Sequence, residues 1–262
     1  MERDFLSLDD VSTEEVMALL DEADKAKKDP SSWSDRIQGA QVVLLFEKPS
    51  TRTRVSFEAA VTSMGGHAIV LRGDELQLGR GETIEDTGRV LSRYVDAIVV
   101  RTFGQDRLER LADAASVPVV NALSDFSHPC QGLADLQTIR EKKGALAGVA
   151  LAYLGDGNNV AHSLMLGGAK TGMDVRIACP NGYEPFPQVV DRCVAIGAET
   201  GGRVTVTNVV AEAATGADVL YTDVWASMGQ EGESSERAAV LEHYQLNGDV
   251  VALAHDDVIV MH

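Results

Sequence analysis

The feature that most constrains the fold is the regular alternation of short apolar, β-rich runs with segments of helical periodicity. Such alternation predicts right-handed βαβ units on parallel sheets, with ligands bound at the loops that follow the carboxyl ends of the strands. The nine predicted strands are Gln41 to Phe46, His67 to Leu71, Asp96 to Thr102, Pro118 to Asn121, Val149 to Leu154, Asp174 to Ala178, Arg203 to Thr207, Val219 to Asp223 and Val258 to His262.

One stretch interrupts the alternation. The residues from His128 to Gly144 contain no strand pattern and predict one long helix that ends at Gly144. With 262 residues, the chain is long enough for two modest domains. We therefore predict an α/β protein of two Rossmann-like domains, residues 1–141 and 142–262, joined by this helix and with the active cleft between them. Another amphipathic helix is predicted over residues 12–28, where Ser12 and Glu15 have the spacing of a capping box.

The composition narrows the possible partners and location. Asp and Glu number 40 against 23 Lys and Arg, a formal net charge of −17, which disfavours binding to nucleic acid or anionic lipid. This acidity is typical of proteins from a salt-rich cytoplasm, although an acidic mesophilic protein is the alternative. The sequence contains neither a long apolar run nor a signal-peptide pattern, so we expect no membrane partner and a cytoplasmic location. Three scattered cysteines predict neither a disulfide framework nor a zinc site.

The clearest chemical signal is the segment Ser50-Thr51-Arg52-Thr53-Arg54, which follows the first predicted strand and begins a helix. A helix N-terminus presents unpaired backbone N–H groups and the positive end of the helix dipole. Hydroxyl donors and a bidentate guanidinium add to this, so the segment predicts a phosphate site. The alternative is a simple N-cap beside solvated arginines, for which one hydroxyl would suffice.

Two further groups follow strands of the first half. Arg101 closes a buried apolar run and is expected at the carboxyl edge of the sheet, the alternative being a strand-end arginine that extends to solvent. His128 begins the sequence His-Pro-Cys-Gln, which ends at Gln131 and otherwise indicates an ordinary turn before a helix.

Two loops of the second half also follow predicted strands. The sequence Gly-Asp-Gly-Asn-Asn, from Gly155 to Asn159, lacks the third glycine of a dinucleotide fingerprint, and no acidic residue ends the next strand. The sequence Asp-Val-Trp-Ala-Ser-Met-Gly runs from Asp223 to Gly229 and could also be an ordinary loop capped by its aspartate.

In this order, the motifs resemble those of the aspartate and ornithine carbamoyltransferase family along nearly the whole chain. The resemblance implies that Arg52, Arg101 and His128 are catalytic. It also implies that the loop of Gln77 reaches the active site of a neighbouring subunit. The protein is then expected to be a homo-oligomer, either a trimer or a multiple of trimers. The carbamoyl-phosphate site implied by the resemblance consists of Ser50, Thr51, Arg52, Thr53, Gln77, Arg101, His128 and Gln131.

The loop that begins at Asp223 resembles the Ser-Met-Gly loop of the ornithine enzymes. The aspartate enzymes lack this pattern and would need cationic groups there for a dicarboxylate acceptor. The resemblance implies that L-ornithine is bound by Asn159, Asp223, Ser227 and Met228. The implied reaction transfers the carbamoyl group of carbamoyl phosphate to the δ-amine, which gives L-citrulline and phosphate without a metal or an organic cofactor. This reaction belongs to arginine metabolism.

The sequence departs from the family after its final predicted strand. Members of the family continue with a Cys-Leu-Pro segment, a later arginine and a closing helix, whereas this sequence stops at His262. We therefore expect the 262-residue chain to retain the phosphate site and to lack measurable citrulline formation. The alternatives are a truncated, inactive carbamoyl-phosphate-binding protein and, from the glycine motif, a dinucleotide-dependent oxidoreductase.

Overall fold

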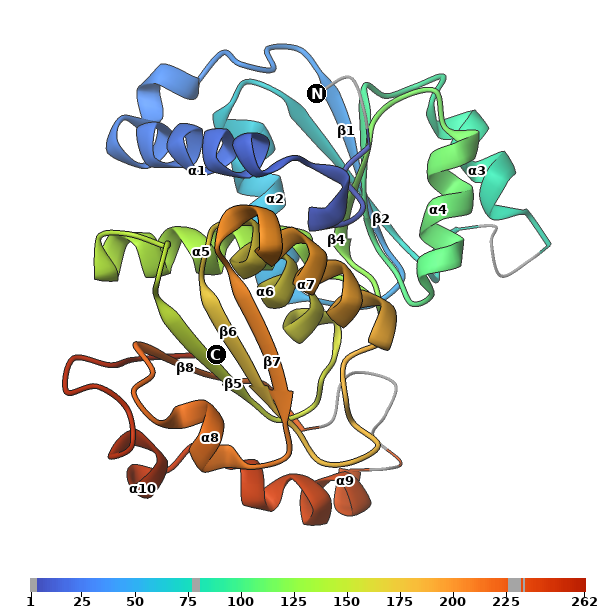
Figure 1. Cartoon of the computed structure of the whole chain (residues 1–262). Helices are drawn as coiled ribbons and strands as arrows, with labels where there is room; N and C mark the ends of the chain where they lie inside the picture. Colours follow the sequence, from blue (N-terminus) through green and yellow to red (C-terminus); the bar gives the residue numbers. More distant parts are fainter. Residues whose placement is uncertain (1–3, 77–80, 226–231, 233) are drawn as a thin grey trace. The chain divides into compact units, whose positions relative to one another are not determined.

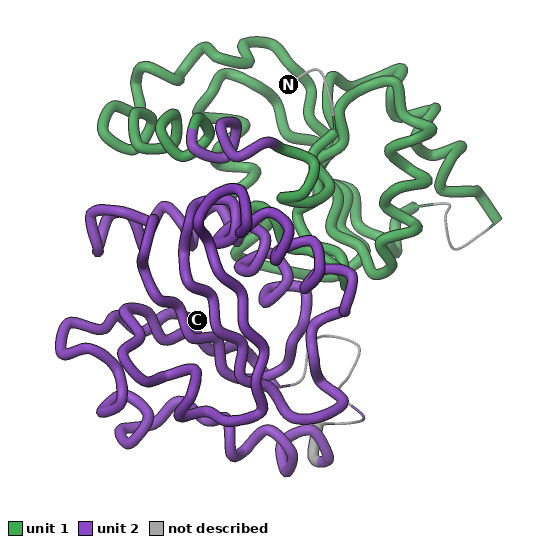
Figure 2. Tube along the Cα trace, viewed as in Figure 1, with its two compact units in different colours: residues 1–11, 18–130 green, residues 12–17, 131–262 purple. Residues whose placement is uncertain are grey.

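The structure, a computed structural model, describes residues 4–76, 81–225, 232 and 234–262. The chain divides into two compact units, residues 1–11 with 18–130 and residues 12–17 with 131–262 (Figure 2). Each unit contains one wholly parallel sheet, which confirms the predicted two-domain α/β fold. The predicted boundary after residue 141 stays a prediction.

The sheet of unit 1 has four strands in the order β2-β1-β3-β4. Figure 1 labels β1, β2 and β4 of this sheet. After β2 the chain crosses back over β1 to form β3, so the direction of winding reverses between β1 and β3. In open parallel sheets, ligands bind outside the carboxyl ends of the strands at such a switch point. The strands are β1 (Gln41–Phe46), β2 (His67–Arg72), β3 (Ala97–Arg101) and β4 (Val119–Leu123); the helices are η1 (Leu8–Asp10), η2 (Pro30–Trp33), α2 (Thr51–Ser63), α3 (Ile84–Leu91) and α4 (Gln105–Ala114).

Helix α1 (Thr13–Lys28) begins with the predicted capping box. The Ser12 backbone N–H donates to Glu15 at 2.7 Å, and the Glu15 N–H donates to the Ser12 hydroxyl at 3.2 Å.

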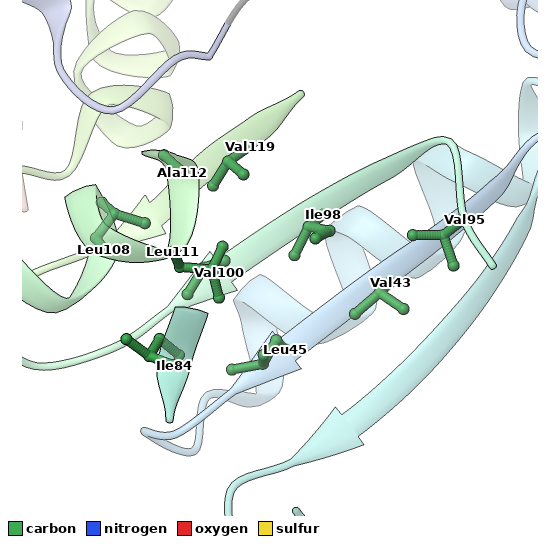
Figure 3. Packing of buried hydrophobic residues seen from close by; sticks show 10 residues of the cluster. All are labelled: Val43, Leu45, Ile84, Val95, Ile98, Val100, Leu108, Leu111, Ala112 and Val119. Carbon is green, nitrogen blue, oxygen red and sulfur yellow. The ribbon is translucent and has the colours of Figure 1, made fainter. Parts of the chain in front are cut away.

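One face of the first sheet packs against α3 and α4 (Figure 3). Ile84 of α3 and Leu108 and Leu111 of α4 lie against alternate residues of the strands, among them Val43 and Ile98. These side chains are almost completely buried, which anchors the strands from which the loops of the carboxyl edge emerge.

The sheet of unit 2 has five strands in the order β7-β6-β5-β8-β9. Its winding reverses between β5 and β8, which is the counterpart of the switch point in unit 1. The strands are β5 (Ala150–Leu154), β6 (Asp174–Ala178), β7 (Arg203–Thr207), β8 (Val219–Thr222) and β9 (Ile259–Met261); the helices are α5 (Pro129–Lys143), α6 (Asn159–Lys170), α7 (Pro187–Thr200), α8 (Val210–Ala214), α9 (Ser234–Leu241), η5 (Glu242–Tyr244) and α10 (Gly248–Val251).

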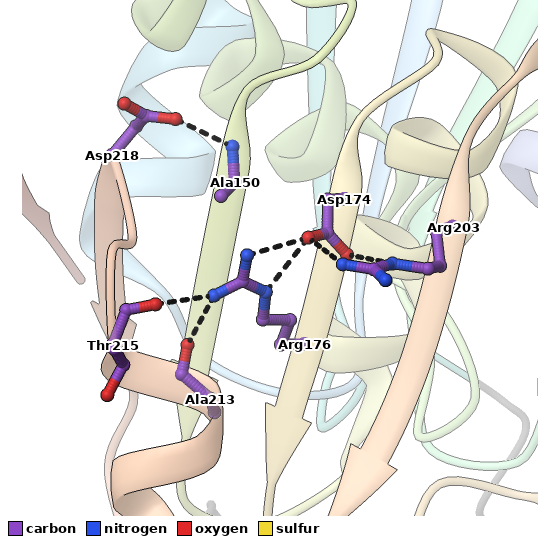
Figure 4. Close-up of polar contacts among 7 residues, drawn as sticks. All are labelled: Ala150, Asp174, Arg176, Arg203, Ala213, Thr215 and Asp218. Carbon is purple, nitrogen blue, oxygen red and sulfur yellow. Dashed lines mark hydrogen bonds and ion pairs between the residues drawn. The ribbon is translucent and has the colours of Figure 1, made fainter.

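An aspartate fastens the amino end of the switch-point strands in both units. The Asp96 backbone N–H donates to the Gln41 carbonyl, and the Asp96 carboxylate accepts the Gln41 N–H, both at 2.8 Å. Asp218 makes the same pair of 2.8 Å bonds with Ala150, of which Figure 4 shows the bond to the carboxylate.

Nearby on the same edge of unit 2, the Asp174 carboxylate accepts hydrogen bonds from Arg176 at 2.7 Å and Arg203 at 2.6 Å (Figure 4). Charged side chains therefore fix the amino edge of this sheet.

The predicted strands agree closely with the observed strands. Three of the nine have identical bounds, and the rest differ by one or two residues at an end. The largest extension is in β4, which continues to Leu123 through an irregularity in its pairing with β3 after Val100. The helix predicted from His128 to Gly144 is α5, which ends where Gly144 adopts a φ of 80°. Among the described residues, no helix combines the length and apolar character that a membrane span requires.

Candidate active site

The predicted phosphate segment lies at the carboxyl end of β1, beside the switch point of unit 1. Ser50 is the N-cap of α2, where its hydroxyl accepts the Thr53 backbone N–H at 3.3 Å and lies 2.9 Å from the Thr53 hydroxyl. The segment can therefore be both an N-cap and a phosphate site, because the Ser50 hydroxyl caps the helix while the other hydroxyls lie in its first turn. Arg52 is exposed there.

A pocket of about 440 Å³ adjoins the same turn on the β2 side. Its lining includes Ser50, Thr51 and Arg54, together with Arg72 at the end of β2. The second arginine of the motif, Arg54, was not among the predicted site residues. The available signal was the position of Arg54 in the first turn of a helix that follows a strand.

Arg101 lies at the end of β3, on the other side of β1. Its side chain is buried, and its Nε has no hydrogen-bond partner among the described residues. Burial lowers the pKa of this guanidinium, although arginine stays charged in proteins. An incompletely satisfied buried cation is costly, so this arginine is suited to an anionic or carbonyl ligand.

His128 follows β4 and is strongly desolvated. Burial, and secondarily the positive charge of Arg101, lowers the pKa of the imidazole to about 4. His128 is therefore neutral at pH 7, with one nitrogen available as a donor and the other as an acceptor. The next cysteine, Cys130, contacts the Asn121 carbonyl at 3.5 Å, and burial raises the pKa of its thiol to about 12, which makes it a poor nucleophile.

Two charged residues before the phosphate segment complete this edge. Glu47 accepts hydrogen bonds from Arg107, the shortest at 2.7 Å, and from the Thr102 hydroxyl. Lys48 is buried, forms an ion pair with Asp125 and lies 4.4 Å from the centre of the Phe103 ring. Both charges thus connect the β1 loop to the chain that follows β3 and β4. Neither residue was predicted from the sequence, because their partners are remote along the chain.

In unit 2, the switch point brings together Asn158, which follows β5, and Asp223, which follows β8. Asn158 caps α6 by accepting the Val160 N–H at 2.9 Å, and its Nδ2 donates to the Asp223 carboxylate at 3.0 Å. The Tyr153 hydroxyl lies 3.3 Å from the same Asn158 oxygen. The predicted Asn159 is the first residue of α6. The asparagine that contacts Asp223 is therefore the residue before it, and the N-cap position was the signal that could have identified it.

An ion pair with a buried arginine lies near Asp223. Arg237 of α9 pairs with Asp156, and its Nε donates to the Trp225 carbonyl at 2.7 Å. The Arg237 guanidinium also lies 4.9 Å from the centre of the Tyr183 ring. These contacts connect α9 to the loops after β5, β6 and β8.

Gln131, in the first turns of α5, forms a third polar cluster in unit 2. Its Nε2 donates to Asp135 at 2.9 Å, and the other carboxylate oxygen of Asp135 accepts from the Tyr221 hydroxyl at 3.1 Å. Burial raises the pKa of Asp135 to about 7, while these two hydrogen bonds oppose the rise. Asp135 and Tyr221 were not predicted, because a carboxylate within a helix carries no local signal of its partners.

Three predicted site residues, Gln77, Ser227 and Met228, lie outside the described residues. Among the described residues, there is no group of three or more His, Cys, Asp or Glu side chains that could hold a metal ion. Unit 1 thus offers cationic and hydroxyl groups for an anion, while unit 2 offers a carboxylate and amides for a cationic ligand.

Both parts of the chain match models of one protein family. Residues 3–141 match the aspartate/ornithine carbamoyltransferase carbamoyl-P binding domain, and residues 147–262 match the aspartate/ornithine carbamoyltransferase Asp/Orn binding domain.

Individual relatives agree with this match. An ornithine carbamoyltransferase of Parafrankia sp. (strain EAN1pec) is 61% identical in an alignment of 263 positions that covers 99% of this chain and 83% of the relative. The solved ornithine carbamoyltransferase of Pyrococcus furiosus is 50% identical with a TM-score of 0.94, and the match covers 100% of this chain and 84% of that one. The anabolic ornithine carbamoyltransferase of Campylobacter jejuni has a TM-score of 0.93 at 35% identity, covering 98% and 84% of the two chains.

Proposed function

Because the chain belongs to the aspartate/ornithine carbamoyltransferase family, we propose that unit 1 binds carbamoyl phosphate and unit 2 binds L-ornithine. The similar proteins are ornithine carbamoyltransferases, and the function is therefore carbamoyl transfer to the δ-amine of L-ornithine, which yields L-citrulline and phosphate. The same relatives favour this function over an oxidoreductase and over an inactive phosphate-binding protein. The anabolic relatives connect the reaction with arginine biosynthesis.

The observation that carries the assignment for unit 1 is the buried Arg101, whose Nε has no partner among the described residues. It lies at the switch point, where β1 also delivers the hydroxyls and backbone N–H groups of the first turn of α2. As the amine attacks, negative charge develops on the carbonyl oxygen and then on the departing phosphate. A fixed guanidinium stabilises that charge without reorganisation during the reaction.

His128 complements Arg101 because it is neutral. With a pKa of about 4, the imidazole donates a hydrogen bond to the carbonyl oxygen without adding a second full positive charge beside Arg101. Ser50, Thr51, Arg52 and Thr53 are proposed to hold the phosphate oxygens through hydroxyl, guanidinium and backbone donors. In this mechanism the protein positions and stabilises, and no covalent intermediate with the enzyme is required.

Unit 2 is proposed to hold the amino-acid end of ornithine. The Asp223 carboxylate pairs with the α-ammonium, while Asn158 keeps that carboxylate in place through its 3.0 Å hydrogen bond. Asn159, Ser227 and Met228 are proposed to provide the remaining contacts. The δ-amine must be neutral to attack, and its ordinary pKa of about 10.4 predicts a rate that rises toward alkaline pH.

We also propose a homo-oligomer, with Gln77 contacting carbamoyl phosphate in a neighbouring subunit. The proposal rests on the family relationship alone. Sedimentation or light scattering would test it, with a trimer or a multiple of trimers as the expected mass and a monomer as the contradicting one.

The decisive test of function uses carbamoyl phosphate with either L-ornithine or L-aspartate. Because the 262-residue chain is expected to lack citrulline formation, this and the later activity measurements use a protein extended by the family's Cys-Leu-Pro segment, later arginine and closing helix. We expect L-citrulline from ornithine at a kcat/KM at least about 100-fold above that for aspartate, since the wrong acceptor leaves buried charges unpaired. In parallel, calorimetry with phosphonoacetamide, a stable isostere of carbamoyl phosphate, measures binding to unit 1. Preference for aspartate, or absence of phosphonoacetamide binding, would overturn the assignment.

A further inference from the structure

Asp135 joins two functional positions of unit 2. One of its carboxylate oxygens accepts from Gln131, a proposed contact of carbamoyl phosphate, at 2.9 Å. The other accepts from the hydroxyl of Tyr221, at 3.1 Å. Tyr221 lies in β8, two residues before Asp223, the proposed contact of ornithine. Asp135 is 4% exposed and Tyr221 is 2% exposed, so water does not compete strongly for these bonds.

The hydrogen bonds decide which end of the Gln131 amide is available to a ligand. Two donors point at the Asp135 carboxylate, which is the arrangement expected of its ionised, acceptor-only form. A Gln131 N–H also contributes to lowering the pKa of Tyr221, which indicates that the amide nitrogen interacts with the phenol as well. Both interactions engage the Gln131 nitrogen and leave its Oε1 as an acceptor, the group that the NH₂ of a carbamoyl ligand requires.

We propose that Asp135 is a positioning residue that, in its ionised form, fixes the Gln131 amide with Oε1 presented to the carbamoyl NH₂. The proposal rests on the proposed function, because it assigns a role within the same site. A protonated Asp135 has one donor and one acceptor oxygen. When its O–H faces Gln131 it donates to Oε1, and Gln131 then turns its N–H groups toward the ligand NH₂, donor against donor. Carbamoyl-phosphate binding then depends on the charge of a side chain that does not touch the ligand.

The surroundings explain why this switch lies near neutral pH. Burial raises the pKa of Asp135 to about 7, and the negative charge of Asp223 adds to the rise. The hydrogen bonds from Gln131 and Tyr221 act in the opposite direction. Tyr153 stacks on Tyr221 with 5.8 Å between ring centres and remains neutral, since burial raises its pKa well above 10. An ammonium bound at Asp223 would neutralise that charge and favour ionised Asp135, so ornithine should strengthen the hold on Gln131.

The test is Asp135→Asn, which keeps the shape of the side chain and removes its charge. We expect the Kd for phosphonoacetamide and the KM for carbamoyl phosphate to rise about 10-fold or more, as for loss of a charged hydrogen bond. The KM for ornithine should change by less than about threefold, because Asp223 and Asn158 are retained. The wild-type Kd should also weaken as the pH falls through about 7. The phosphonate of the ligand titrates in the same way with the wild type and with Asp135→Asn. The difference between the two plots of Kd against pH therefore reports the titration of Asp135.

Two further variants separate positioning from a general structural effect. Tyr221→Phe keeps the ring on Tyr153 but removes a hydrogen bond to the carboxylate, so the midpoint of the pH profile should move upward. In a Gln131→Ala background, Asp135→Asn should have almost no further effect on phosphonoacetamide binding. The matched control is Asp174→Asn, at the amino edge of the same sheet, which should leave both the affinity and its pH profile unchanged.

The outcomes also separate this proposal from the assignment of function. Wild-type protein that forms citrulline, with an Asp135→Asn variant of unchanged carbamoyl-phosphate affinity and pH profile, would overturn the role of Asp135 alone. Additive effects of the Gln131 and Asp135 substitutions would do the same. Wild-type protein that binds no phosphonoacetamide would overturn the function from which the proposal starts.

Discussion

Burial changes the solvation and the pKa of individual side chains in this protein from the values that these groups have in water. Arg101 is charged but desolvated, His128 is neutral at pH 7, and Asp135 has a pKa of about 7. Each group lies next to the end of a strand or in the first turns of a helix, where the fold positions it at little conformational cost. Perturbed groups of this kind are typical of functional sites.

At Arg101, replacement with Gln should lower kcat/KM for citrulline formation about 100- to 1000-fold, the usual cost of losing a donor to developing negative charge. Circular dichroism should show the fold unchanged. The control is Arg176→Gln, which removes a guanidinium at the amino edge of the unit 2 sheet. This variant should keep kcat/KM within about twofold of the wild-type value. Similar losses in the two variants would contradict a specific role for Arg101.

For Asp223, the informative change is to Asn, whose single oxygen can keep only one of the two hydrogen bonds that the carboxylate accepts, from Asn158 at 3.0 Å and from the Val224 N–H at 2.8 Å. The charge and one of these bonds are lost, so the KM for ornithine should rise about 30-fold, equivalent to roughly 2 kcal/mol, while the KM for carbamoyl phosphate changes less than about threefold. Steady-state kinetics with each substrate varied in turn measures both constants. Equal increases in the two would refute the assignment of Asp223 to the acceptor.

His128 also makes stability depend on pH. The folded state lowers its pKa from 6.5 to about 4, so protonation favours the unfolded chain. Its contribution is complete above pH 6.5 and is lost as the pH falls toward 4, by an amount on the order of 3 kcal/mol. Urea denaturation between these pH values should show a shallower decline for His128→Asn than for wild type. Parallel declines would mean that other groups govern acid sensitivity.

At the level of helices and strands, the sequence predicted the β1, β6 and β7 bounds because polar or turn residues closely follow each of these β-rich runs. It did not predict the continuation of β4 to Leu123, since that depends on the irregular pairing after Val100, which is a property of two strands together.

From the sequence, candidate site residues could be proposed where the pattern is local, whereas contacts that depend on the tertiary structure were missed. Ser50 to Arg54 could be interpreted from a single loop, and Arg101 from the end of one strand. Asn158 and Asn159 are chemically identical neighbours, and only the N-cap geometry shows which of them meets Asp223.

The loop after β5 has little space for a side chain at Gly157. A Cβ there would lie 2.4 Å from the Pro185 nitrogen and 2.7 Å from the Tyr183 carbonyl oxygen, both of them backbone atoms. Gly157→Ala should therefore destabilise the protein by about 1–3 kcal/mol. Gly248→Ala provides the control, because no atom lies within 4 Å of its Cβ position. Thermal unfolding of the two variants compares them directly, and equal midpoints would show that the Gly157 loop relaxes freely.

For the whole molecule, the dominant property is the formal net charge of −17. Raising KCl from about 0.05 M to 2 M shortens the Debye length to below about 3 Å and should screen this repulsion, so the thermal midpoint should rise. Sucrose of matched osmolality, which does not screen charge, separates electrostatic from excluded-volume stabilisation. A lower midpoint in KCl would show that surface pairs such as Arg110–Glu85, also screened by salt, outweigh the repulsion.

Asp96 forms paired hydrogen bonds with Gln41, and Asp218 forms the same pair with Ala150. Backbone groups at the amino end of each sheet therefore have hydrogen-bond partners without any ligand. The opposite edge of each sheet carries the residues proposed to meet the substrates. Changes that alter ligand preference can therefore accumulate in the loops of one edge while the aspartate bonds keep the strands in register. A library that varies only the carboxyl-edge loops should thus yield many folded proteins with new acceptor preferences, whereas one that varies Asp96 and Asp218 should yield mainly unfolded chains.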